Sequence, residues 1–426
     1  MAFIGKQEPL PKARPRKRRW TIPPLPNAVV RGFPGFPILD EIQGEPELGL
    51  LLWQRFNDIT EWRRTPDAAK AALFCPGTEY GTLLDSLAAT APPAVPMRNA
   101  SAILRDGMST HARELASCCK QVASWANMNG FIETGALYAL LAAHLLPRDG
   151  LLNFEAGRAE RNCARYHRAE QWFQRAIGLA RRAGDEETYA AAYLGWGLLE
   201  EQRGRHSEAV RLYTRALRAA MRGGLRELAA AARHNMVPLA AQLGRFEEGQ
   251  EHIKAAYKFY GKDAAIARLA ADAACFWAWF GYFDLARLVY HAVLGRIDRI
   301  PDRIQVLANI ARASAAMQDE SGYSRVSAEI NELDSGGRHV PPRVWVDLAE
   351  GARSLGRTRA ALELAARAME EAEGRGEDAT LAAARRVLGA IHSGTPADAN
   401  KAAPLRLQRF AARLVKRVNE LPREGE

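Results

Sequence analysis

The residues best suited to chemistry in this sequence form one small cluster. His111, Glu114 and Cys118 are spaced i, i+3 and i+7, which places them on one face of a helix. Imidazole, carboxylate and thiolate are all ligands of Zn²⁺, but a stable structural site usually has four ligands. The spacing supplies no fourth ligand, so we interpret the cluster as a helix face with a His–Glu pair and predict no metal site.

Other signatures of catalysis are missing from the sequence. It contains no GxGxxG, GxxxxGK, GxSxG or HExxH motif, and these motifs mark several common cofactor and catalytic sites. The adjacent Cys118 and Cys119 could be redox-active, although free cysteine is more often buried as a small hydrophobe. The five cysteines show no CxxC spacing, which is typical of reduced thiols in the cytoplasm. We predict a non-enzymatic, cytoplasmic protein with no cofactor.

Positive charge is concentrated at the two ends of the chain. The 426 residues have a formal net charge of +10. Residues 1–31 hold eight Lys or Arg and one Glu, whereas residues 401–426 hold seven Lys or Arg and three Glu. The body between them is nearly neutral. An acidic partner that is attracted by net charge would therefore contact the two basic ends of the chain.

The basic N-terminal end is also rich in proline. Eight of the 22 prolines fall in residues 1–45, and repeated X-Pro bonds disfavour helix and favour extended backbone. We predict an arm that is disordered on its own. Its basic cluster could contact nucleic-acid phosphates, or serve as a localisation signal, a solubilising tail or a segment that docks on an acidic protein. The cations of this cluster are Lys12, Arg14, Arg16, Lys17, Arg18 and Arg19.

After residue 45 the sequence pattern becomes helical. Apolar residues recur at three-residue steps within residues 46–64, and beyond residue 98 the pattern predicts helices of 12–18 residues joined by short breaks. No alternating pattern typical of strands is present, so we predict an all-α protein. Pro238 would lie inside one helix, where we expect a kink or a break. No apolar run reaches the ~18 residues of a membrane span.

One sequence pattern recurs along the helical region. It consists of a small residue followed by an aromatic residue two positions later, Ala at five, an aromatic at nine and Ala at twelve. Each copy predicts a turn followed by a helix that packs closely on its predecessor. A degenerate copy falls near Asp319 and a weak one near Asn129. The main copies begin at Ala164, Gly204, Gly244, Gly281 and Gly356.

This pattern resembles the tetratricopeptide repeat, with its signature W-x2-L-G-x2-Y then G-x-Y-x2-A-x3-F-x2-A. The copies at Ala164, Gly204 and Gly281 match its second half well, and the first half is matched less completely. The resemblance covers about residues 129–394. It implies an α-solenoid, a right-handed superhelix of antiparallel helix pairs, with repeats longer than is usual for the family. We divide the chain into the arm (1–45), a helical segment with irregular loops (46–97), the repeats (98–394) and a C-terminal helix (395–426).

The resemblance also implies a function and a site. Such solenoids hold a peptide or protein segment in a concave groove lined by the first helix of each pair, so a scaffold, adaptor or regulatory sensor is expected. Arginine and asparagine there would suit an acidic segment or a terminal carboxylate. The alternative is that these residues are solvated polar faces of ordinary helices. The implied groove residues are Arg158, Arg161, Asn162, Gln202, His234, Arg268, Trp279, Asn309, Arg343 and Arg353.

Two further features leave alternatives open. The C-terminal helix is basic and amphipathic, and could lie on an anionic membrane. A solenoid needs its last helix to cover the exposed core, so we predict a cap. Seven aromatics fall within residues 276–290; we interpret them as one repeat interface, with Trp279 directed toward the groove. The alternative function is a nucleic-acid-associated regulator whose arm contacts phosphates.

Overall fold

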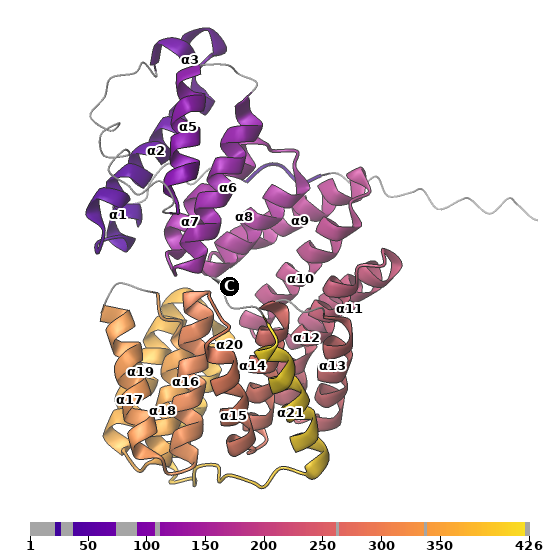
Figure 1. The fold of residues 1–426 in the computed structure, drawn as a ribbon, viewed down its shortest axis with the longest axis vertical. Coiled ribbons are helices and arrows are strands. Elements are labelled where there is room, and N and C mark those ends of the chain that lie inside the picture. The colour runs from indigo at the N-terminus through magenta and orange to yellow at the C-terminus, as the bar shows by residue number, and fades with distance from the viewer. Residues whose placement is uncertain are drawn as a thin grey trace, which may run out of the picture.

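The computed structural model describes residues 22–26, 37–73, 92–106, 111–260, 264–335 and 339–421. Every regular element within these residues is a helix, and consecutive helices pack on one another as antiparallel pairs. The protein is therefore an all-α solenoid, which confirms the predicted fold class (Figure 1). The basic cluster at residues 12–19 lies outside the described residues. No helix that the structure describes is both long and apolar enough to span a bilayer.

The helices fall into an N-terminal group and a long array of pairs. The N-terminal group comprises α1 (Pro37–Glu41), α2 (Pro46–Arg64), α3 (Asp67–Leu73) and α5 (Ala94–Asp106). The pairs are α6 (Ala112–Met128) with α7 (Ile132–Leu145), α8 (Gly150–Asn162) with α9 (Tyr166–Ala183), α10 (Glu186–Gln202) with α11 (His206–Arg222), α12 (Arg226–Gln242) with α13 (Phe246–Phe259), α14 (Ala264–Trp279) with α15 (Phe283–Leu294), α16 (Ile300–Ala316) with α17 (Glu320–Ser335), and α18 (Pro342–Ser354) with α19 (Thr358–Arg375). Two helices follow, α20 (Asp378–His392) and α21 (Leu405–Asn419).

The turn within each pair is built on the residue that begins the recurring pattern. Gly204 and Gly281 have φ angles of +70° and +92°, a conformation that glycine adopts without steric cost. Ala164 (φ +58°) and Gln318 (φ +60°) take the same left-handed conformation with a side chain present. The residue after the turn donates its N–H to a carbonyl near the end of the preceding helix, as Arg205 does to Glu200 at 2.8 Å. The degenerate copy therefore turns at Gln318.

Buried glutamates fasten two of these turns at equivalent positions of successive repeats. The Glu160 side chain is fully buried and forms ion pairs with Arg165 (3.6 Å) and Arg168 (2.8 Å). Glu200, at the equivalent position of the next repeat, pairs with Arg205 at 3.3 Å. A buried carboxylate is stable only when cations and donors compensate its lost hydration, so each glutamate ties the end of one helix to the next turn.

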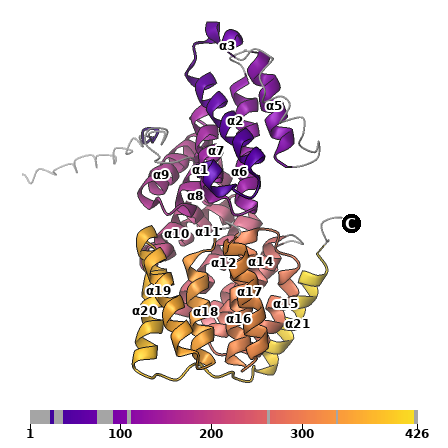
Figure 2. The same ribbon diagram turned by 90° about the vertical axis from the view of Figure 1, so that its left-hand side faces the viewer.

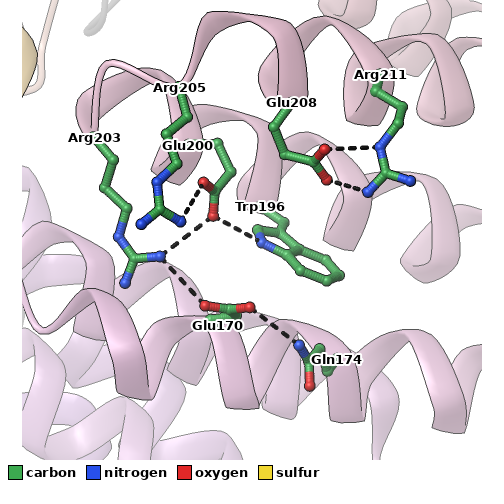
Figure 3. A network of polar contacts seen from close by, with 8 residues as sticks. All are labelled: Glu170, Gln174, Trp196, Glu200, Arg203, Arg205, Glu208 and Arg211. Atoms are coloured by element: carbon green, nitrogen blue, oxygen red, sulfur yellow. Dashed lines mark hydrogen bonds and ion pairs between the residues drawn. The ribbon is translucent and has the colours of Figure 1, made fainter.

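The contacts of Glu200 extend across three helices. Its carboxylate accepts from the indole Nε1 of Trp196 at 3.2 Å and from Arg203 at 3.4 Å. Arg203 also reaches Glu170 of α9 at 3.3 Å, as Figure 3 shows. Ion pairs and hydrogen bonds thus join α9, α10 and α11, and fix how one pair is rotated against the next.

The solenoid curves until its end contacts its beginning. Helix α20 packs against α10, and Figure 2 shows the end of the array returning to that region. The Arg375 guanidinium, at the end of α19, donates to the backbone carbonyl of Asn162 at the end of α8 at 3.0 Å. The last helices of the array therefore lie against α8 and α10.

Helix α21 lies on the side of the array, whereas the sequence predicted a cap on its last pair. Its main contacts are with α15 and α14, and its Phe410 ring packs edge-on against Trp277 (6.3 Å between centroids) and Tyr257 of α13 (5.5 Å). Residues 393–404 carry the chain along the base of the array to this place (Figure 1). Helix α14 is apolar on most of its surface because α21 covers it from outside.

Two other expectations concern Pro238 and the N-terminal arm. Helix α12 continues through Pro238 without a break. Parts of the predicted arm contact the body: the carbonyl of Pro23 accepts a hydrogen bond from Arg175, and Pro37 begins α1, where a proline is tolerated because the first turn needs no N–H donor. The carboxylate of Glu41 in α1 accepts from the backbone N–H of Glu133 and Thr134, both at 2.7 Å, at the start of α7.

Candidate binding site on the inner face

A cavity of about 280 Å³ lies on the inner face of the later repeats. Its walls come from α14, α16 and α18, which are the first helices of three successive pairs, and from α20, which follows the last pair. The lining residues are Trp279 of α14, Arg312 of α16, Arg343, Val346 and Glu350 of α18, Ala383 and Arg386 of α20, and Asp398 of the segment before α21. The stacking of pairs brings these residues together although they are far apart in the sequence.

Two of the cavity arginines share one buried carboxylate. Asp347 of α18 is 2% exposed, and its oxygens lie 3.3 Å from the Arg312 guanidinium and 3.4 Å from that of Arg343. Gln305 also donates to Asp347 at 2.9 Å. Burial opposes the charge of Arg312, but attraction by Asp347 and Glu350 outweighs burial and raises the pKa of Arg312. One buried carboxylate therefore holds both guanidinium groups in place.

A third arginine lacks such compensation. Arg386 forms no ion pair with any carboxylate in the described part of the chain. Arg386 is exposed, and partial burial, and then repulsion by Arg343, lowers its pKa, although attraction by Glu350 opposes this shift. An anion entering the cavity would relieve this repulsion, so the cavity favours a negatively charged group.

The remaining wall is apolar and aromatic. Trp279 is half-buried and packs on the main core, with Val346 and Ala383 beside it around the cavity. Glu350 pairs with Arg353 at 2.8 Å, and its carboxylate also attracts Arg312 and Arg386. A ligand with a carboxylate and an adjoining apolar part would match both walls.

The structure brings part of the implied groove set to this cavity. Trp279 and Arg343 line it, and Arg353 lies next to it through Glu350. Asn309 is buried one helical turn after Gln305, which donates to it at 3.5 Å. These four residues come from α14, α16 and α18 and surround one region.

The other implied groove residues lie elsewhere. Arg158 pairs with Glu155 beside a smaller cavity of about 140 Å³ between α6, α7 and α8. Arg161 donates to the Asn162 side chain at 2.9 Å, and Asn162 is at the self-contact with Arg375. The pair Arg158 and Asn162, one turn apart on α8, thus faces two different environments.

The middle of the array holds the last three. Gln202 is half-buried at the end of α10. The His234 ring lies 2.6 Å from the Asp272 carboxylate and 3.2 Å from the Tyr260 hydroxyl. Arg268 is exposed one turn before Asp272 on α14. None of the three lines the cavity around Trp279.

The cluster His111, Glu114 and Cys118 does not converge on one point. The His111 ring pairs with Glu114 at 3.5 Å, while Cys118 is buried and burial raises the pKa of its thiol to about 11. Within the described ranges, no three His, Cys, Asp or Glu side chains are grouped as metal ligands.

Sequence reasoning missed the cavity residues Arg312, Arg386 and Asp398, and it missed the buried Asp347 that pairs with Arg312 and Arg343. Arg312 lies one turn after Asn309 on the same helix face, so the helical period offers a signal for it. Arg386 lies in α20, and continuing the repeat register by one helix would have included it. Asp398 lies in an irregular segment without any periodic signal.

Comparisons with known proteins add little beyond the helical repeat character. No protein-family model matches the chain, and no curated protein sequence matches it. It is similar to the crystal structure of a signal transduction ATPase with numerous domains (STAND) protein with a tetratricopeptide repeat sensor from Pyrococcus horikoshii, at 12% identity and a TM-score of 0.43. That likeness covers 88% of this chain and 61% of the other, so the chain spans about three fifths of that protein's length.

It is also similar to a circular tandem repeat protein with novel repeat topology, at 16% identity and a TM-score of 0.16. That match covers 89% of this chain and 83% of the other. Neither likeness carries a statement of function. The fold and the cavity define an all-α repeat protein with a charged site on its inner face.

Proposed function

We propose that the protein is a non-enzymatic, tetratricopeptide-like recognition module, a scaffold, adaptor or regulatory sensor. It binds an acidic segment of a protein partner at the inner-face cavity. The observation that carries the proposal is the arrangement of Trp279, Arg343 and Arg386 around one cavity, with Arg386 lacking a carboxylate partner among the described residues.

Binding follows from the charges and shapes of the two walls. A carboxylate from the partner accepts hydrogen bonds from Arg386 and Arg343, while the adjoining apolar part of the segment packs on Trp279. A hydrogen bond to a charged group contributes about 1.5–3 kcal/mol. Removing one arginine is therefore expected to weaken binding by about 10- to 100-fold.

A library of fluorescein-labelled decapeptides with one or two Asp or Glu residues, titrated onto the full chain, tests this proposal. Arg386→Glu and Trp279→Ala should each weaken binding of the acidic peptides by tenfold or more. Arg359→Glu is the matched control, because Arg359 is fully exposed on the outer helix α19 and pairs only with Glu363 in the described chain. Equal binding by Arg386→Glu and the control would refute the cavity as the site.

The same titrations address the nucleic-acid alternative. A basic arm that contacts phosphates would bind generic duplex DNA with an affinity that falls steeply as the salt concentration rises. If deletion of residues 1–31 removes such binding and the acidic peptides fail to bind, the nucleic-acid role is favoured over the one proposed.

A further inference from the structure

The segment between α20 and α21, residues 393–404, which we call the strap, is fixed at two points beside the cavity. Near its beginning, the carbonyl of Thr395 accepts from the Arg353 guanidinium at 2.9 Å. Further along, the Asn400 side chain accepts from the backbone N–H of Phe283 (3.0 Å) and Asp284 (3.1 Å) at the start of α15.

The second fixed point is reinforced by the next residue. The backbone N–H of Lys401 donates to the carbonyl of Gly281 at 2.8 Å, and its ammonium group donates to the carbonyl of Phe280 at 3.1 Å. The strap thus spans from α18, which supplies three of the lining residues, to the turn after α14, which supplies Trp279.

Between these two points the strap presents one functional side chain. Its sequence from Thr395 to Asn400 is Thr-Pro-Ala-Asp-Ala-Asn, without helical structure. Pro396, Ala397 and Ala399 offer only small apolar groups, whereas Asp398 lines the cavity with Arg343 and Arg386. An extended backbone with one carboxylate between small residues is the kind of ligand that the cavity walls fit.

Asp398 lines the cavity but leaves its arginines available to another anion. It forms no ion pair within 4 Å in the described chain and its side chain is exposed. It nevertheless occupies part of the entrance and supplies negative charge near the arginines. A partner carboxylate must therefore displace Asp398 or share the same cations with it, and both reduce the partner's affinity.

We propose that the strap is a tethered competitor for the partner, and that the partner segment has the strap's own chemistry: an extended stretch with one acidic residue between small residues. The inference rests on the proposed function, and adds to it both a sequence preference and an intrachain regulation. Displacement requires only the stretch 395–399 to move, because Asn400, Lys401 and α21 hold the rest of the strap in place.

The test compares wild type with Asp398→Ala and Asp398→Glu, using the labelled acidic decapeptides and a labelled peptide of sequence TPADAN with blocked ends. Asp398→Ala should bind the acidic peptides and TPADAN about 3- to 10-fold more tightly than wild type. Asp398→Glu should stay near wild type, and TPANAN should bind at least tenfold more weakly than TPADAN. Glu373→Ala, which removes an exposed carboxylate on α19, should change nothing.

The outcomes separate this inference from the function beneath it. If Arg386→Glu abolishes peptide binding while Asp398→Ala leaves it at the wild-type value, the cavity is the site and the strap is not a competitor. If Asp398→Ala and Glu373→Ala tighten binding equally, the effect is one of general charge and the inference is also wrong. If no peptide binds any variant, the proposed function itself fails.

Discussion

The docking of α21 on the side of the solenoid gives the sharpest test of the structure. Phe410 is 5% exposed and contacts the rings of Trp277 and Tyr257 edge-on. Replacing it with Ala removes about 2 kcal/mol of apolar transfer free energy. It also removes two aromatic contacts of about 0.5–1.5 kcal/mol each and leaves a cavity. We expect Phe410→Ala to weaken the docking of α21 by about 3–4 kcal/mol.

Because α21 is the last described helix, this loss should appear as local undocking before the array unfolds. Trypsin can cleave α21 at its several Lys and Arg residues only when the helix has detached. A loss of about 3 kcal/mol raises the detached population roughly 100-fold, and the cleavage rate rises with it when detachment is fast relative to cleavage. The measurement is the rate of cleavage within α21 at low protease concentration, followed by mass spectrometry.

Leu405→Ala is the matched control, since Leu405 belongs to the same helix but is 60% exposed. Its cleavage rate should stay within about twofold of wild type, because exposed apolar substitutions usually change stability by less than about 0.5 kcal/mol. If Phe410→Ala and Leu405→Ala are cleaved equally slowly, α21 does not depend on the contact with Trp277 and the assigned packing is wrong.

Three further predictions concern the repeats themselves. Ala164→Gly should raise the free energy of unfolding by about 0.5–1 kcal/mol in urea denaturation. Glycine relieves the strain of ~1–2 kcal/mol that a side chain causes in the left-handed conformation, but it also increases the entropy of the unfolded chain. A destabilised variant would contradict the positive φ of Ala164. Glu160→Ala should cost about 1–3 kcal/mol in the same assay because it removes the buried carboxylate from Arg165 and Arg168, while Arg165 keeps its ion pair with Glu133. A loss below about 1 kcal/mol would show that the Glu160 ion pairs add no more than exposed ones. Burial raises the pKa of Glu201 from 4.5 to about 7, so its contribution to stability is full at low pH and is lost as pH rises from 4.5 through 7. When the pH rises from 5 to 8, the free energy of unfolding of wild type should therefore fall by roughly 2–3 kcal/mol more than that of Glu201→Gln. Identical pH profiles of the two proteins would refute this.

The repeat register was the most predictable feature of the protein. The turn residues at Gly204, Gly244 and Gly281 were identified correctly because a tight turn requires a left-handed φ that few residues accept. Trp277 is one of the seven aromatics assigned to a single repeat interface, and it is fully buried. The sequence also shows that Glu160 and Glu200 occupy equivalent positions in successive repeats. It does not show that each is buried and forms ion pairs.

The candidate site was only partly predictable. Trp279 and Arg343 could be placed on an inner face by carrying the repeat register along each helix. Their meeting with Arg386 was not predicted, because no groove position was carried into α20 although that helix lies within the predicted repeats (98–394). The positions Arg161 and Asn162 follow the same register, yet they lie where the array closes on itself at Arg375.

By itself, the sequence determined the all-α class, the helix pairs and the turn positions, since these depend on backbone preferences and apolar spacing within a single repeat. Only the tertiary structure decided that α21 covers α14, that the array meets itself, and that the strap crosses the cavity. Each of these contacts depends on the small rotation between successive pairs, summed over many repeats. No local pattern records that sum, so the sequence could assign the aromatic stretch around Trp277 to a repeat interface but could not predict that Phe410, from the last described helix, packs against it.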